Sequence, residues 1–331
     1  MLNLFTKKKK VKDISILMSK GFDAVENCEI KKAIKIGKKL KKLRHSSAFE
    51  ILAMAYHSDN KLQKAIKTLQ EGVKCAPNVG ILWQLLGNYQ SENFNFDEAQ
   101  IYYQKALSCS DYPADSIKYN SALAYLNSKE YEKAANECDL IDLNKLQKDE
   151  NYKLFVLSTA LKIEILNCQK HFGEANEISK SILEKNWDTD ILHEEIAYFY
   201  ASHAETLINI EKSNDAITFL WKSIELDKNQ KKAQWLIREI ENRYSENSKY
   251  FRILIEGTWS APFEGEKSVP GFFTSYDVVA DSLEDALNYI KKFEPAEISN
   301  SLKISKFEEF ENDPENPQGV YKSNGYAFFK Q

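Results

Sequence analysis

A repeating unit of about 34 residues organises the first two thirds of this sequence. The apolar and small residues that begin at Phe49 and continue to Ala65 return 34 positions later at Trp83 and Ala99. Each half of the unit carries apolar residues at helical spacing, and polar turn residues separate the halves. Because one helix pair cannot bury its apolar stripe alone, the pairs must stack on their neighbours. The repeat therefore predicts an array of helix pairs.

The residues at these positions resemble the tetratricopeptide repeat, whose signature reads W-x2-L-G-x2-Y, then A-x3-F, then P. Trp83, Leu86 and Gly87 match its first half, and Ala99 and Tyr103 match its second. The resemblance covers about residues 14–229, with the last two units irregular. It implies a mainly α fold: a right-handed superhelical solenoid of about six helix pairs, with a concave groove lined by the first helix of each pair.

The period changes after the array. We expect a basic N-terminal tail at 1–13, the repeat array at 14–229, a closing helix at 230–245 and a small α+β domain at 250–331. Within that domain, alternating residues predict strands at 251–256, 272–280 and 301–307, with a helix capped by Ser282. Asn324-Gly325 predicts a hairpin within 320–329. This order of elements suggests a ferredoxin-like relative.

Composition and charge narrow the class of protein. Five scattered cysteines, with no paired spacing, argue against a disulfide framework or a zinc site. No apolar run is long enough for a signal peptide or a membrane span, so we expect a cytoplasmic protein. Residues 1–44 hold 14 lysines and arginines against 4 acidic residues, whereas residues 245–331 hold 9 against 15. This asymmetry bears on partners and not on fold.

Catalytic patterns are absent from the sequence. It has no glycine-rich phosphate loop, no G-x-S-x-G elbow and no H-E-x-x-H motif. His193 and His203 are nearly three helical turns apart, too far to bind one ion together. We therefore expect a non-enzymatic protein with no catalytic residue, cofactor or metal site. The alternative is an enzyme or nucleotide-binding regulatory protein that acts through the C-terminal module, near Trp259 or Tyr276, and is targeted by the array.

The resemblance implies which residues line the groove. Chaperone-binding members of the family clamp a terminal carboxylate with basic residues. The places of those basic residues hold Met18, Glu50, Ser116 and Asn120 here, which argues against such a clamp. In the long loop 257–271, Trp259 and Phe263 are further candidate anchors. The groove residues predicted to bind a protein partner are Glu50, Met54, His57, Gln84, Asn88, Tyr119, Leu123, Leu126 and Asn127.

These features favour a protein that binds a protein or peptide partner in the groove and through the C-terminal module. A sharper hypothesis is a bacterial immunity protein that neutralises a toxin. The lysine-rich segment Lys31–Arg44 predicts a charged convex surface, and the alternative is attraction of an acidic partner, anionic lipid or nucleic acid. Nucleic acid is the least favoured partner, because the rest of the chain is acidic and no aromatic residues lie between these lysines.

Overall fold

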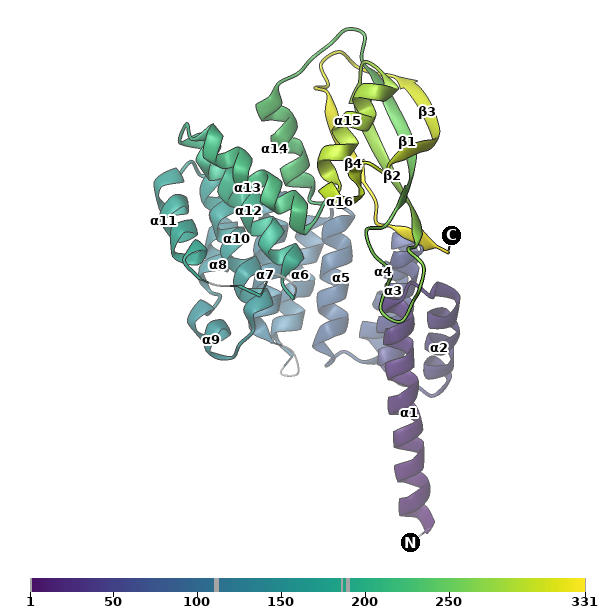
Figure 1. Cartoon of the computed structure of the whole chain (residues 1–331). Coiled ribbons are helices and arrows are strands. Elements are labelled where there is room, and N and C mark those ends of the chain that lie inside the picture. The colour runs from purple at the N-terminus through teal and green to yellow at the C-terminus, as the bar shows by residue number, and fades with distance from the viewer. Residues whose placement is uncertain (1, 110–112, 186, 189–190, 331) are drawn as a thin grey trace. The chain divides into compact units, whose positions relative to one another are not determined.

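The computed structural model describes residues 2–109, 113–185, 187–188 and 191–330, with side chains from residue 13 onward. The described chain divides into two compact units, residues 1–142 and residues 143–331. Figure 1 labels their helices and strands. The division falls inside the predicted repeat array, after its fourth helix pair, so the array contributes to both units.

The first unit consists of four consecutive helix pairs. Helix α1 already begins at Leu2, so the backbone of residues 2–13 is helical where a tail was expected. The helices are α1 (Leu2–Glu26), α2 (Ile30–Lys42), α3 (Ser47–Ser58), α4 (Leu62–Cys75), α5 (Gly80–Glu92), α6 (Phe96–Leu107), α7 (Ala114–Asn127) and α8 (Tyr131–Asp139).

Small residues set the distance between paired helices. A Cβ placed on Gly87 of α5 would lie 2.6 Å from Cε1 of Tyr103 on α6, so only glycine allows this approach. Trp83 is only partly buried, although the repeat predicts an interior position. Its indole packs between the core of the α3–α5 region and the cluster around Tyr103, and its Nε1 donates to the Pro77 carbonyl at 2.7 Å.

The turn inside a helix pair has the same geometry in successive pairs. One residue adopts a positive φ: Asn60 at 54°, Phe94 at 61° and Lys129 at 64°. The next amide N–H then donates back to the first helix, as from Asn95 to the Gln90 carbonyl at 2.8 Å. This single left-handed residue ends the first helix and satisfies one of its last carbonyls. We call its place in each pair the turn position.

The second unit begins with two longer pairs and a closing helix. Helices α10 and α12 have 17 residues each, and the short helix α9 was not expected from the sequence. The helices are α9 (Leu143–Lys148), α10 (Tyr152–Cys168), α11 (Phe172–Leu183), α12 (His193–Asn209), α13 (Ser213–Leu226) and α14 (Lys231–Glu241). Together with the four pairs of the first unit they give the six expected helix pairs.

A small α+β module completes the second unit. Its sheet has the order β3-β1-β2-β4, with antiparallel neighbours throughout. Ser282 caps α15 as expected, because its Oγ accepts the Asp285 N–H at 3.1 Å. The elements are β1 (Lys249–Thr258), β2 (Gly271–Ala280), α15 (Leu283–Phe293), α16 (Ala296–Ser299), β3 (Lys303–Glu311), β4 (Gly319–Ser323) and β5 (Ala327–Phe329).

Two expectations about this module are wrong. A ferredoxin-like fold has a helix between its first two strands, whereas β1 and β2 are adjacent antiparallel strands joined by a loop without a helix. The predicted hairpin is also absent, because β4 and β5 both pair with β2 and not with each other. Asn324 lies between β4 and β5. Its N–H donates to the Ser275 carbonyl at 3.0 Å, which holds the connection between the two strands along β2.

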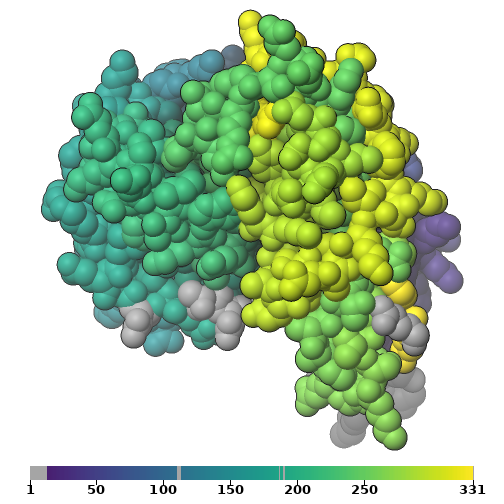
Figure 2. Space-filling view, turned by 45° about the horizontal axis from the view of Figure 1, so that its top comes forward, coloured from purple at the N-terminus to yellow at the C-terminus, as the bar shows by residue number. Residues whose placement is uncertain are grey.

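The module shares one hydrophobic core with the last helices of its unit. This core runs from Ala201 on α12 through Leu220 and Ile237 to Ile253 and Val320 in the sheet. Figure 2 shows the last helices in green lying directly against the module in lime and yellow.

Polar contacts strengthen the same interface. Gln234 Nε2 donates to Ser323 Oγ at 3.0 Å, and Arg238 donates to the Val320 carbonyl. Through these contacts the module covers α14 and closes this end of the repeat array.

Candidate protein-binding sites

The residues predicted to line the groove lie on the first helices α3, α5 and α7. Most of them are accessible: Met54, His57 and Asn88 are partly buried and Asn127 is exposed. Gln84 and Leu126 differ from the prediction, since they are only 6% and 8% exposed and offer a partner almost no surface. The accessible remainder, Glu50, Tyr119 and Leu123, is also partly buried.

Polar and aromatic side chains join α3 to α5 on this face. His57 Nε2 lies 2.7 Å from Glu92 Oε2, and the His57 ring stacks on Tyr89 with centroids 4.6 Å apart. Burial raises the pKa of Tyr89 to about 12, and the neighbouring carboxylates of Glu92 and Glu50 add to the increase. His57 and Glu92 are still 39% and 51% exposed, so this pair is accessible to a partner.

The remaining polar groups make this face neutral to acidic. Burial raises the pKa of Glu50, whereas Asn88 uses its side-chain carbonyl to accept the Tyr103 hydroxyl at 3.0 Å. Gln84 Oε1 is buried and has no hydrogen-bond partner in the described part of the chain. None of the nine predicted groove residues is a lysine or arginine. These nine residues therefore supply no lysine or arginine to hold a carboxylate.

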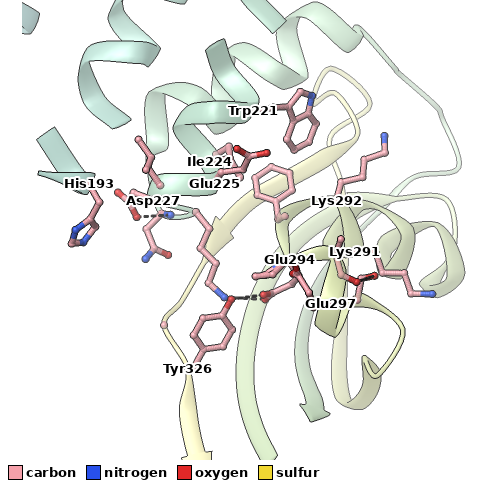
Figure 3. Close-up of a pocket in the computed structure, with 18 of the residues that line it drawn as sticks. His193, Trp221, Ile224, Glu225, Asp227, Lys291, Lys292, Glu294, Glu297 and Tyr326 are labelled. Carbon is pink, nitrogen blue, oxygen red and sulfur yellow. Dashed lines mark hydrogen bonds and ion pairs between the residues drawn. The ribbon is translucent and has the colours of Figure 1, made fainter. Parts of the chain in front are cut away.

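The second unit contains an open cleft with a volume of about 1130 Å³. It lies between the end of α13 and the segment formed by α15 and α16. Figure 3 shows Trp221 and Glu225 on the α13 side and Lys291, Lys292 and Glu297 on the other side. Its side chains thus mix aromatic rings with both signs of charge.

A buried ion pair forms the floor of this cleft. Lys228 Nζ lies 2.9 Å from Glu294 Oε1, and the Glu294 side chain is completely buried. The Tyr276 hydroxyl donates to the same carboxylate oxygen at 2.6 Å, and the Tyr326 hydroxyl donates to the other oxygen. Burial lowers the pKa of Lys228, and Glu294 opposes that shift.

This cluster joins the last repeat to the module. Lys228 follows α13 and Glu294 follows α15, so the pair fastens the end of the repeats to the module. Tyr276 is 1% exposed, and its hydroxyl is already bound. The Tyr276 side chain itself therefore offers almost no surface to a small molecule. The sequence contains no signal for the pair, because its members are single charged residues 66 positions apart.

The two aromatic candidates in the loop between β1 and β2 have different environments. Trp259 packs edge-on against Phe272, Tyr326 and Phe328, at centroid distances of 5.8, 5.1 and 5.2 Å, so much of its surface is used by the fold. Phe263 touches only the rim of this cluster, 4.9 Å from the Phe328 centroid, and is 41% exposed. Phe263 is therefore the more accessible of the two.

The basic segment Lys31–Arg44 contains α2. Its core face consists of Ala33, Gly37 and Leu40, and its lysines lie largely outside the core. Lys41 pairs with Glu71 of α4 at 2.6 Å. The arrangement gives α2 a charged exposed face, and an acidic partner for it stays a prediction.

His193 and His203 both lie on α12 and do not form a metal site together. His203 is buried between Phe199 and Phe219, and burial lowers its pKa to about 4. Glu195 pairs with Lys153 at 2.6 Å. Among the residues with described placement, no group of three or more His, Cys, Asp or Glu side chains is arranged to hold a metal ion.

None of the described helices has the length and apolarity required to cross a membrane.

Stacked helix pairs with small residues at their contacts define the class of helical-repeat proteins. Residues 81–110, which span α5 and α6, match the family model of the tetratricopeptide repeat. Residues 81–110 therefore carry a tetratricopeptide repeat, and the described chain combines stacked helix pairs with a C-terminal α+β module.

Solved structures share this fold at low sequence identity. One is a tetratricopeptide repeat protein from Parabacteroides merdae, with a TM-score of 0.52 and 15% identity over 70% of this chain and 86% of that one. PilF of Pseudomonas aeruginosa gives 0.50 and 13% over 70% and 99%. The Cut9–Hcn1 hetero-tetramer gives 0.53 and 16% over 68% and 42%. No curated protein sequence matches the chain.

Proposed function

We propose that this chain binds a partner protein on the face formed by α3, α5 and α7. The observation that carries the proposal is the His57–Glu92 pair, which joins neighbouring first helices while both side chains remain accessible. A core does not need such a pair at its surface, and exposed ion pairs contribute little to stability. A partner with hydrogen-bonding groups would find donors and acceptors already fixed in place.

The chemistry of the face restricts the partner. Glu50 and Glu92 are acidic, and the predicted groove residues include no lysine or arginine. A peptide segment with neutral polar or basic residues is favoured over one that ends in a buried carboxylate. The similarity to Cut9, solved as a hetero-tetramer with Hcn1, supports a role in assembling proteins.

The sharper form of the proposal is a bacterial immunity protein whose partner is a toxin. Its support is the layout: a repeat array with an accessible face, followed by a module that carries an exposed aromatic residue at Phe263. A toxin inhibited in this way would be held at two places on the chain. Coexpression of the chain with the captured partner should then restore growth that the partner alone prevents.

The test of binding uses the full-length chain. Affinity capture from the native cell with mass spectrometry should identify a stoichiometric protein partner, which is then titrated by calorimetry. The double variant His57→Ala/Asn127→Lys should weaken binding at least tenfold, because it changes the accessible side chains of α3 and α7. Lys67→Glu, on an exposed side of α4, is the matched control and should bind normally. Unchanged affinity of the double variant would refute the assignment of this face.

A further inference from the structure

The most exposed large apolar side chain in the described structure is Phe94, which is 82% exposed. It occupies the turn position between α5 and α6, in the segment that matches the tetratricopeptide repeat model. The one aromatic ring near it among the described residues is Phe96, edge-on with centroids 6.3 Å apart. Burial in the core therefore contributes almost nothing to keeping a phenylalanine here.

The backbone at Phe94 makes this residue type still less expected. Its φ of 61° lies in the left-handed region, which costs about 1–2 kcal/mol for a residue with a Cβ atom. Asparagine is among the side chains that tolerate this conformation best. Non-aromatic residues occupy the equivalent turn positions of the other pairs, namely Cys28, Asn60, Lys129, Lys170 and Glu211. The fold needs only a residue that accepts positive φ, so it does not explain the phenyl ring.

The surroundings of Phe94 indicate what could cover it. Glu92, Asp97 and Glu98 are exposed acids close to it in sequence. No lysine, arginine or histidine occurs between Lys74 and Lys105, a stretch that contains α5 and most of α6. An anionic membrane surface would be repelled by these acids. A protein surface with an apolar pocket bordered by basic residues would be complementary to them.

We propose that Phe94 is an anchor residue, which inserts its ring into an apolar pocket bordered by lysine or arginine on a partner protein. This inference rests on the proposed function, because it assumes a protein partner, but it places a decisive contact on the α5–α6 turn and not on the groove face. Single aromatic side chains that fill a pocket commonly dominate the binding energy of an interface.

Stability separates an anchor from a structural residue. Phe94→Asn introduces the residue found at the Asn60 turn and removes the strained aromatic, so the chain should be as stable as the native protein or more stable in urea unfolding. Lys129→Phe is the mirror variant, which places a phenylalanine at the next turn position, and it should not gain stability. Clear destabilisation by Phe94→Asn would overturn the proposal, because the ring would then belong to the fold.

Binding is tested with a defined probe at the same position. A photoreactive p-benzoylphenylalanine at position 94 of the full chain should form one major adduct in the native cell, and the same probe at position 129 should not. The adduct protein, once purified, should bind Phe94→Asn at least tenfold more weakly than the native chain, with Phe94→Leu between them. Equal affinity for the native chain and Phe94→Asn would overturn the proposal.

Further comparisons separate the Phe94 proposal from the groove proposal, and test whether a membrane or a second copy of the chain covers Phe94 instead. If the groove variant His57→Ala/Asn127→Lys binds normally and Phe94→Asn does not, the groove assignment fails and the anchor stands; the reverse result overturns the anchor alone. Cosedimentation with vesicles of 30% phosphatidylserine in phosphatidylcholine should show no binding that depends on Phe94. Such binding, or self-association abolished by Phe94→Asn in light scattering, would overturn a separate protein partner.

Discussion

Replacement of Gly87 by alanine tests whether close approach of α5 and α6 holds the repeat together. The new methyl group would lie 2.6, 2.8 and 3.1 Å from Cε1, Cδ1 and Cζ of Tyr103, whereas ordinary contacts begin near 3.4 Å. The Tyr103 ring is 1% exposed, and its hydroxyl donates to Asn88, so it has no open space into which to move. The helices must therefore separate or the ring must leave its rotamer.

The expected magnitude follows from two opposing effects. Overpacking of a filled core usually costs about 1–3 kcal/mol. Alanine is favoured over glycine inside a helix by about 1 kcal/mol, which offsets part of that loss. Because three atoms of a fixed ring are too close, we expect the packing effect to dominate and the free energy of unfolding to fall by about 1–2 kcal/mol.

The measurement is urea unfolding of the full chain, with hydrogen exchange of α5 and α6 to locate the effect. Gly173→Ala on α11 is the matched control, since a Cβ there meets nothing within 4 Å. It should leave stability unchanged or raise it by up to about 1 kcal/mol. Tyr103→Leu should make the Gly87→Ala change less harmful, which a double-mutant cycle would detect. If Gly87→Ala is as stable as Gly173→Ala, close helix approach is not what selects glycine.

Two further predictions concern buried charge in the second unit. Burial lowers the pKa of His203 from 6.5 to about 4 in the folded protein. As the pH falls, the unfolded chain therefore binds a proton at this residue before the folded chain does. The contribution of neutral His203 to the free energy of unfolding should be complete above about pH 6.5 and should fall by about 3 kcal/mol towards pH 4. His203→Gln should remove this part of the pH dependence in urea unfolding, and an unchanged slope would contradict the assignment. Glu294→Gln leaves Lys228 buried without its counter-charge and should cost about 3–5 kcal/mol, whereas Lys228→Met/Glu294→Gln should recover most of the loss. A loss below about 1 kcal/mol for Glu294→Gln alone would show that the pair is not needed.

Sequence reasoning predicted the repeat array well because its pattern records local packing. Gly87 and Ala99 are small where helices approach, and Leu86 is apolar where a helix faces the core, so both the fold and the helix positions follow from spacing. The cap at Ser282 was predicted for the same reason, since its hydrogen-bond partner Asp285 is only three residues further along the chain. Local chemistry is visible in a single sequence.

Features that depend on distant neighbours were not predictable. Asn324-Gly325 has the residues of a tight turn, but the nearby edge of β2 offers Ser275 as a hydrogen-bond partner, and the chain stays extended. Gln84 has the spacing of a groove residue and is nevertheless buried. The Lys228–Glu294 pair is fixed by contacts between elements far apart in sequence.

Phe94 is different, because a signal for it existed. A comparison of turn positions between repeats shows an aromatic residue where Asn60 and Lys129 stand in the neighbouring pairs. The sequence alone shows that Phe94 departs from the repeat pattern. The structure adds that its ring is exposed and its φ is positive, which together indicate that the fold does not require a phenylalanine there. Deviations from a repeat consensus are therefore worth the same scrutiny as matches to it.

The shared core of the second unit has a consequence for the order of folding during synthesis. The first unit can bury Leu69, Leu86 and Tyr103 using only residues before 143, so its folding does not have to await the rest of the chain. The core that begins at Ala201 includes Val320 and is complete only when almost the whole chain has left the ribosome. Until then the part of this core that packs against the sheet has no cover, and this interval is when the nascent protein is most exposed to aggregation and to chaperones.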